Sequence, residues 1–284
     1  MLAIAQISLE LGLLYSLAVC SIYLSFRILD FPDLTVDGSF TLGGAVSAVL
    51  LTLGWHPLSA VLLSALCGFL AGATTAALHS YIRINKILAG ILTLTMLYSV
   101  NLRVMSGPNI PLLGKETISQ VASLIPLPQP FPLLTLYLIL SGFILIAVNY
   151  FLRTEVGLLI RATGANEQLV RSVAKDPDAF RLLGIGLANL LAAISGSLAA
   201  QNFGFADIGL GVGVIVVGFA SLLIGEAIVR PRTVRTHLGA ALLGSLLYQA
   251  IIALALRLGL VPTDLKLVTA VIVIALLAFN RIRQ

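Results

Sequence analysis

Long apolar runs alternate with short polar breaks along most of this chain. An α-helix needs about 20 consecutive apolar residues to cross the hydrocarbon core of a bilayer. The stretch Gly38–Ile82 contains no Asp, Glu, Lys or Arg, and it is too long for one such helix. Trp55-His56-Pro57 divides it into two, because proline ends or opens helices and tryptophan favours the membrane interface.

The same pattern predicts nine membrane spans, within a range of eight to ten. Besides the two spans within Gly38–Ile82, they cover approximately Leu9–Leu29, Ile87–Met105, Phe131–Leu152, Leu182–Phe203, Ile208–Val229, Leu238–Leu256 and Pro262–Asn280. Glycines interrupt the seventh span, and Asp264 and Lys266 shorten the ninth. The sequence therefore predicts an all-α polytopic membrane protein, a single domain over residues 1–284 with broken or re-entrant helices.

Composition agrees with lipid as the main solvent of this chain. Of the 284 residues, 59% are hydrophobic and 10% are charged, whereas soluble domains carry about a quarter charged residues. The net charge of +5 does not indicate a nucleic-acid partner, because the basic residues are scattered through short loops. The first apolar run lacks the basic start and the small-residue cleavage site of a secretory signal, so it is predicted to be a spanning helix.

Lysine and arginine are distributed unequally between the two sides that nine spans define. Thirteen fall on one side and four on the other. Cytoplasmic loops carry the excess of Lys and Arg, so the first side is predicted to be cytoplasmic, with the N-terminus outside and the C-terminus inside. The larger group comprises Arg27, Arg83, Lys86, Arg153, Arg161, Arg171, Lys175, Arg181, Arg230, Arg232, Arg235, Arg281 and Arg283, and the smaller group comprises Arg103, Lys115, Arg257 and Lys266.

Two segments share an acid, spaced glycines and a following apolar run. They read DGSFTLGGA from Asp37 and DIGLGVG from Asp207. Interrupted, glycine-containing helices border the solute pathway in several transporter folds, whereas small residues also serve plain close packing of helices. Both interpretations stay open. The candidate pathway residues are Asp37, Gly38, Gly43, Gly44, Asp207, Gly209, Gly211 and Gly213.

The other acids near span ends are interpreted as structural. Asp30 and Asp33 are predicted to lie at the membrane surface, where Arg27 is available to pair with one of them. The role of Asp37 is left open. Glu226, at the cytoplasmic end of the seventh span, is expected to form an ion pair with nearby Arg230.

The sequence contains no catalytic or metal-binding pattern. His56, His79 and His237 are isolated, and no set of His, Asp and Glu has the spacing of a zinc site. Cys20 and Cys67 lie inside apolar runs, also without metal-ligand spacing. A GxxxxGK[ST] phosphate loop is missing, so we expect no nucleotide hydrolysis by this chain, no enzymatic activity and no cofactor.

Arg153–Arg181 is the longest hydrophilic stretch of the chain. Asn166 is a predicted helix N-cap, and Glu167–Ala174 is predicted to form about two helical turns that end at Asp176-Pro177. A short helix in a cytoplasmic loop suits contact with a soluble partner. On physical grounds alone, an inert connector is an equal alternative.

Two motifs in the chain resemble those of one protein family. TxxGxxxRAxGxN, from Thr154 to Asn166, is followed by LGI at 183–185. This pattern resembles the cytoplasmic loop of bacterial ABC importer permeases in the branched-chain amino acid and simple-sugar group. FPDLTVDGSFTLGGA, from Phe31 to Ala45, resembles the signature near the second span of that group. The likeness extends from about Asp30 to Gly244 and is greatest to permeases for tryptophan, tyrosine or undefined solutes.

The resemblance implies a non-catalytic permease subunit of an ATP-driven importer in the bacterial cytoplasmic (inner) membrane. Two permease subunits, expected to be a homodimer, would form the pathway, with two ATPase subunits beneath them and an extracytoplasmic solute-binding protein delivering the solute. The loop at about 153–181 would couple to the ATPase. The coupling residues that the resemblance implies are Gly157, Arg161, Ala162, Gly164, Asn166, Glu167 and Val170.

The low charge of the predicted spans favours a neutral or zwitterionic solute over metal ions or phosphate. An amino acid, in particular an aromatic one, is the first expectation, and a sugar or nucleoside is the second. The alternative from another class is a gradient-driven secondary transporter. Such a protein would need buried acids or a proton relay within its spans, and the sequence gives little sign of either.

Overall fold

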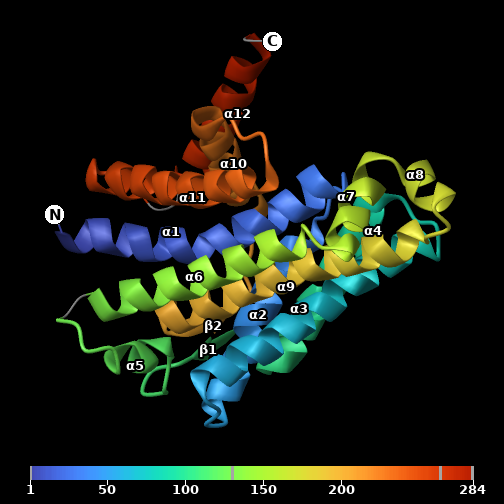
Figure 1. Cartoon of the computed structure of the whole chain (residues 1–284). Helices are drawn as coiled ribbons and strands as arrows, with labels where there is room; N and C mark the ends of the chain where they lie inside the picture. The colour runs from blue at the N-terminus through green and yellow to red at the C-terminus, as the bar shows by residue number, and fades with distance from the viewer. Residues whose placement is uncertain (1, 129–130, 262–263, 283–284) are drawn as a thin grey trace.

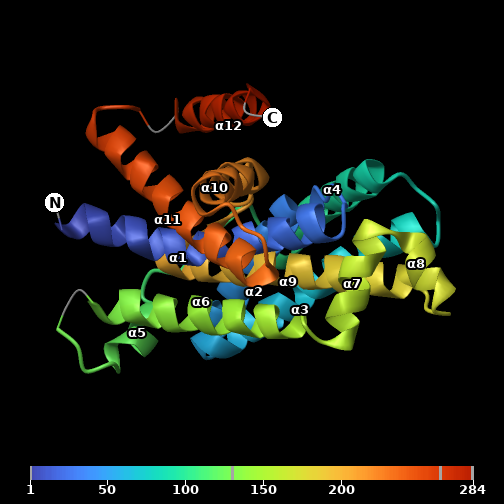
Figure 2. The ribbon, with the colours of Figure 1, turned by 45° about the horizontal axis from the view of Figure 1, so that its top comes forward.

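The computed structural model describes residues 2–128, 131–261 and 264–282, which are mostly helical (Figure 1, Figure 2). The α-helices are α1 (Leu2–Ile22), α2 (Thr35–Thr52), α3 (Pro57–Ser80), α4 (Lys86–Met105), α5 (Ile118–Ser123), α6 (Phe131–Phe151), α7 (Glu155–Ala165), α8 (Glu167–Ser172), α9 (Pro177–Phe203), α10 (Val214–Val229), α11 (Val234–Arg257) and α12 (Leu265–Ile282). A π-helical stretch, η1 (Tyr23–Ile28), continues α1. Two short strands, β1 (Asn109–Pro111) and β2 (Phe205–Asp207), pair antiparallel.

Seven of the described helices are long and apolar enough to cross a membrane. They comprise Gln6–Ile28 of the α1–η1 helix together with α2, α3, α4, α6, α9 and α11. The shorter apolar helices Val214–Val229 and Leu265–Ile274 coincide with the seventh and ninth predicted spans. The all-α polytopic fold is therefore confirmed. Pro262, the predicted start of the ninth span, lies outside the described residues.

The turn between α2 and α3 confirms the predicted division of the long apolar stretch. Pro57 occupies the first turn of α3, where its missing N–H costs nothing. The His56 ring accepts a hydrogen bond from Leu58 N (3.3 Å), and Gly54 turns the chain with a φ of +82°. Local sequence alone is thus sufficient to start α3.

The α1–η1 helix, α2 and α9 form the buried centre of the molecule. In their spanning windows 78%, 72% and 78% of the residues are buried, against 28% for α4 and 22% for α6, so the last two leave most of their surface uncovered by the rest of the chain. Figure 1 shows α1, α6, α9 and α3 side by side with roughly parallel axes. We call the end of these helices that carries α8 the α8 end, and the end that carries α5 and the β1–β2 pair the β end.

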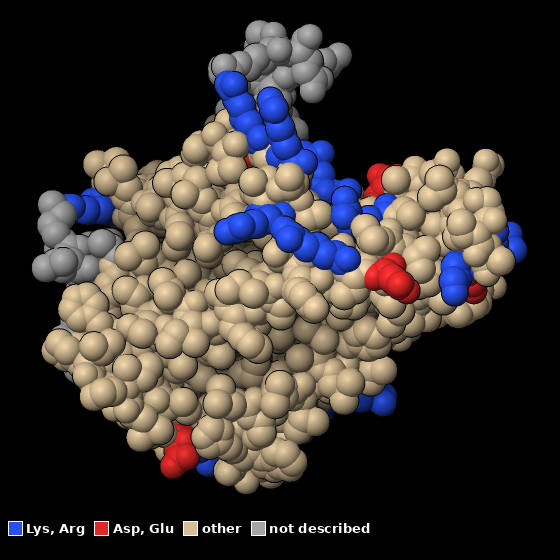
Figure 3. Space-filling model, viewed as in Figure 1, with Lys and Arg blue, Asp and Glu red and all other residues tan. Residues whose placement is uncertain are grey.

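Charged side chains gather toward the ends of the helices. Figure 3 shows one face with a broad uncharged band, and cationic side chains toward its upper and right-hand margins. At the α8 end Arg27 pairs with Glu226 (2.5 Å), because the end of α10 meets the end of η1. This contact corrects two expectations: Arg27 binds neither Asp30 nor Asp33, and Arg230 is not the partner of Glu226 among the described ion pairs.

Glycines let α2, α3 and α9 approach until their backbones touch. A Cβ atom on Gly43 would overlap the backbone oxygen of Ala193, and one on Gly196 would overlap that of Phe40. Ser64 Oγ of α3 donates a hydrogen bond to the carbonyl oxygen of Gly43 (3.0 Å). Small residues serve helix association in lipid, where burial from water does not drive it. The centre is therefore held by contacts between backbone atoms.

Replacing Gly196 by alanine should destabilise the protein, because the new methyl group has no room against Phe40. Overpacking of this kind costs about 1–3 kcal/mol. Gly142 of α6 is the matched control, since nothing lies within 4 Å of a Cβ placed there. Gly142→Ala should leave stability unchanged or raise it slightly. Thermal unfolding of the detergent-purified variants measures both effects, and equal midpoints would refute the packing argument.

Candidate functional site

α10 begins within the helix bundle, not at a membrane surface. After β2, residues 208–213 form successive turns, and α10 then runs for 16 residues from the buried Val214 to Val229. Gly213 adopts a φ of +92°, a left-handed conformation that residues with a Cβ atom rarely take. Residues 208–213, predicted as the first part of the seventh span, are therefore not helical, whereas the segment from Asp37 lies in the unbroken helix α2.

Asp37 of α2 caps the start of α10. Its Oδ2 accepts a hydrogen bond from Gly213 N (3.0 Å), and its Oδ1 accepts one from Ile215 N (2.8 Å). One turn further along α2, Thr41 Oγ1 accepts a hydrogen bond from Gly211 N (3.0 Å). A carboxylate at this position satisfies N–H groups that have no partner within the helix, and the helix dipole favours its charge. The two glycine-containing segments therefore meet, and Asp37 of the first holds the second.

Asp207 plays a different part from Asp37. Its Oδ1 accepts a hydrogen bond from Gly209 N (2.8 Å) in the turn after β2, and its Oδ2 accepts one from Asn109 Nδ2 of β1 (3.4 Å). The segments that begin at Asp37 and Asp207 thus resemble each other in sequence but differ in local structure. One segment lies in a long helix, and the other forms a turn near the β end.

The remaining glycines of these segments differ in how closely they are packed. Gly38 faces side chains of α4, and Gly43 and Gly44 face α9. Gly211 lies against the backbone of α2, whereas Gly209 is exposed. Four of the five thus make the contacts of close helix packing. Their role in lining a pathway stays a prediction.

Asp33 is buried, so its predicted surface position is wrong. It is 0% exposed in the turn between η1 and α2, where its Oδ2 accepts a hydrogen bond from Asn189 Nδ2 of α9 (2.6 Å). Its Oδ1 accepts one from Thr35 N (2.9 Å). Burial raises the pKa of this carboxyl, and the hydrogen bonds from Thr35 and Asn189 oppose the rise. Asp30 lies at the surface as predicted, and its carbonyl oxygen accepts from Lys86 Nζ (2.8 Å).

The long hydrophilic stretch folds into two helices, α7 and α8. Asn166 Oδ1 accepts hydrogen bonds from Gln168 N (3.0 Å) and Leu169 N (3.4 Å), so Asn166 caps α8 as predicted. α7 was missed from sequence, because Gly157 and Gly164 weaken its helical pattern. The same glycines allow the backbone of α7 to touch the end of α6 and the end of η1.

Arg181 of α9 anchors α8 to the rest of the molecule. Its buried guanidinium contacts the carboxylates of Glu167 and Asp178, and it donates a hydrogen bond to Ser80 Oγ of α3 (3.1 Å). Val170 of α8 is fully buried as well. Sequence analysis did not single out Arg181, because Ser80 lies 101 positions away in the chain. α8 is therefore fixed to α3 and α9 through paired, buried charge.

The outer face of the α7–α8 unit carries exposed apolar and basic side chains. Leu169 and Val173 are each 56% exposed, and Arg161 of α7 is exposed as well. Ala162 is half-buried. Neighbouring apolar side chains that lie beyond the membrane spans are a feature of protein-binding surfaces.

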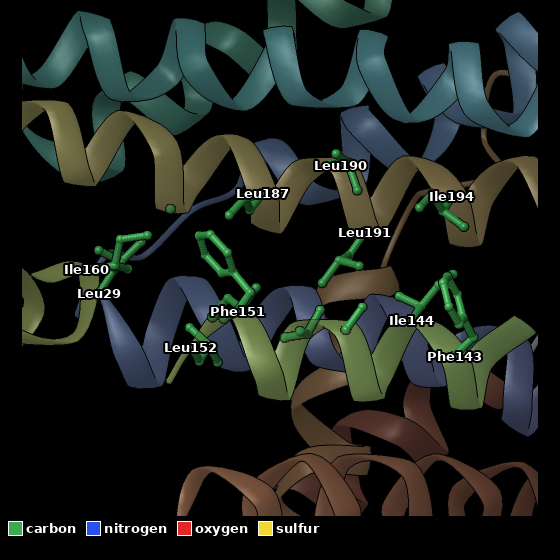
Figure 4. A pocket seen from close by; sticks show the side chains of 14 residues that line it. Leu29, Phe143, Ile144, Phe151, Leu152, Ile160, Leu187, Leu190, Leu191 and Ile194 are labelled. Atoms are coloured by element: carbon green, nitrogen blue, oxygen red, sulfur yellow. The ribbon is translucent and has the colours of Figure 1, made fainter. Parts of the chain in front are cut away.

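A cavity of about 310 Å³ lies between α6 and α9 (Figure 4). Its lining is apolar throughout, with side chains such as Phe143, Phe151, Leu187 and Leu191. A zwitterionic or hydroxylated solute would lose its hydration there without gaining a hydrogen bond. We therefore do not assign solute binding to this cavity.

Comparison with known proteins gives a family match along almost the whole chain. The family model described as "Branched-chain amino acid transport system / permease component" matches residues 4–278. A tyrosine transport system permease protein of Clostridioides difficile is 39% identical over 94% of this chain and 88% of its own length. An uncharacterised protein of Rickettsia prowazekii is 34% identical over 93% of both chains. No solved structure matches the chain significantly.

Replacing Asp37 by alanine should loosen the start of α10, because Gly213 N and Ile215 N lose their acceptor. Loss of such a cap costs about 1–3 kcal/mol. Amide hydrogen exchange at residues 213–217 should therefore rise by roughly ten- to a hundredfold. Asp207→Ala, which removes a carboxylate from the neighbouring turn, should leave exchange in α10 unchanged. Equal exchange in α10 of both variants would contradict the capping role.

Proposed function

The chain belongs to the family of permease components of branched-chain amino acid transport systems, and on that premise we propose that it is the membrane-spanning subunit of an ATP-driven (ABC) importer. In this proposal two copies of the chain form the pathway in the bacterial cytoplasmic membrane. Two copies of an ATPase subunit bind at the α8 end, and an external solute-binding protein binds at the β end. The excess of Lys and Arg in the predicted cytoplasmic loops supports a cytoplasmic α8 end and C-terminus.

The α7–α8 unit is the observation that carries this proposal. It presents Leu169, Val173 and Arg161 to the outside, while Arg181 and Val170 fix it to the spans. A short helix that is rigidly attached on one side and apolar on the other suits a groove in a soluble partner. The partner of this proposal is the ATPase subunit.

Three contacts would transmit a movement of this unit into the membrane. The backbone at Gly157 touches α6, the backbone at Gly164 touches η1, and Arg181 joins α8 to α3 and α9. Closure of the ATPase pair on ATP would move α8 as a rigid body and tilt these helices. The pathway would then switch between two states that differ in their contacts with the ATPase.

The proposed solute is an amino acid, with aromatic amino acids as the first candidates. The relative that is 39% identical is named for tyrosine transport. Among the pathway candidates Asp37 and Asp207 are the only charged residues, and both carboxylates accept hydrogen bonds from the protein itself. Such a lining suits a neutral or zwitterionic solute better than an ion.

Vanadate-sensitive ATPase activity of the purified complex tests the proposal. The chain, expressed with its genomic neighbours and purified by a tag on this subunit, should retain an ATPase subunit and hydrolyse ATP in lipid. A folded preparation with neither partner nor activity would refute the importer assignment. Gradient-driven uptake would then be the next measurement.

Arg161→Glu should lower solute-stimulated ATPase activity and uptake by at least about tenfold, since charge reversal at a protein interface costs several kcal/mol. The variant should still insert in the membrane, because Arg161 is exposed. Arg103→Glu, at the opposite end of the spans, is the control and should retain activity. Wild-type coupling in Arg161→Glu would count against α7 as part of the ATPase contact.

Leu169→Asp should dissociate the ATPase subunit or uncouple it, because a carboxylate would replace an apolar side chain at the proposed contact. Loss of such a contact costs about 2 kcal/mol or more. Leu113, which is 94% exposed in the connection after β1, offers a matched control. Leu113→Asp should co-purify with the ATPase normally. If both variants retained the ATPase subunit, α8 would not be part of the interface with it.

A further inference from the structure

A second cavity, of about 350 Å³, lies where α10 begins. It is bordered by α1, α10, α11 and the first turns of α12. Val212 and Gly213, in the turn that precedes α10, form part of its wall. Its size is within the range of small-molecule sites. Unlike the cavity between α6 and α9, it combines apolar walls with several polar groups.

Gln249 of α11 is a polar group of this wall that has no hydrogen-bond partner within the described residues. It is 9% exposed, and its side-chain amide makes no hydrogen bond within the described part of the chain. The neighbouring Tyr248 hydroxyl, by contrast, is held by Thr269 Oγ1 of α12 (2.6 Å). The amide of Gln249 is therefore available to a ligand in the cavity.

Among the described residues that line this cavity, Lys266 of α12 is the only charged one. The other positive feature nearby, the N-terminus of α10, is already occupied by the Asp37 carboxylate through Gly213 N and Ile215 N. The negative group of a ligand would consequently be drawn to Lys266 and not to the helix. A solute without a negative group would gain less from this lysine, because it would lack a charge-assisted hydrogen bond.

We propose that this cavity is the contact site of the permease for an amino acid with a large apolar or aromatic side chain. Lys266 binds the carboxylate, the amide oxygen of Gln249 accepts a hydrogen bond from the ammonium group, and Val212, Val216 and Ile252 surround the side chain. The inference rests on the proposed importer function and adds the residues that touch the solute.

Uptake of labelled L-tyrosine by proteoliposomes that contain the complete importer gives the first test. Lys266→Gln and Gln249→Leu should each lower the maximal rate at saturating binding protein by about tenfold, which corresponds to loss of one charge-assisted hydrogen bond. Lys266→Arg, which keeps the charge, should retain most of the rate. Arg103→Gln, which removes an exposed cation of α4, is the control. Wild-type rates in Lys266→Gln and Gln249→Leu would overturn the proposal and leave the importer function intact.

Thiol labelling tests the cavity without the ATPase or the binding protein. Val216→Cys is introduced after replacing Cys20 and Cys67, the two cysteines of the chain, by alanine. L-tyrosine or L-phenylalanine should slow the reaction of Cys at this position with a hydrophilic maleimide several-fold, and ribose should not. Protection would support the site even if ATP-driven uptake failed. Absence of protection by either amino acid, or equal protection by ribose, would overturn it.

Discussion

The Asp37 carboxylate holds the first N–H groups of α10, and the middle of the molecule depends on this contact. A bilayer offers no water to a helix that begins inside it, so each unpaired N–H group there would cost several kcal/mol. Because Asp37 belongs to α2, its hydrogen bonds fix the start of α10 beside the first turn of α2. Residues 208–213, which connect β2 to α10, form turns. Val212 and Gly213, in the non-helical segment before α10, line part of the second cavity at this level.

α2 also links this cap, through α9, to the α8 end of the molecule. Its Gly43 and Phe40 touch the backbone of α9 without an intervening side chain. α9 in turn carries Arg181, whose buried guanidinium pairs with Glu167 of α8. The proposed ATPase contact is therefore connected through α9 and α2 to Gly213, which α2 holds and which lines the proposed solute cavity. Rigid connections of this kind allow two distant sites to share one conformational equilibrium.

Sequence analysis succeeded where the physical cause is local. Hydropathy located the spans, and Pro57 marked the start of a helix. Asn166 was predicted to be an N-cap because it directly precedes a short segment predicted to be helical. It failed for Asp33, because the amide that permits burial comes from Asn189, 156 positions away in the middle of an apolar helix. It likewise missed the acceptor role of Asp37, whose partners lie 176 and 178 positions further on. Such contacts depend on which helices become neighbours, and no pattern within one segment contains that information.

The glycine contacts among α2, α3 and α9 also limit how this chain can change during evolution. Every other amino acid has a Cβ atom, so no single nucleotide change at the codon for Gly43 or Gly196 yields a side chain that fits without moving a helix. α6 is under no such restriction at Gly142. Divergence between descendants of this gene should therefore be concentrated on the more exposed helices, such as α6, while α2, α3 and α9 keep their small residues.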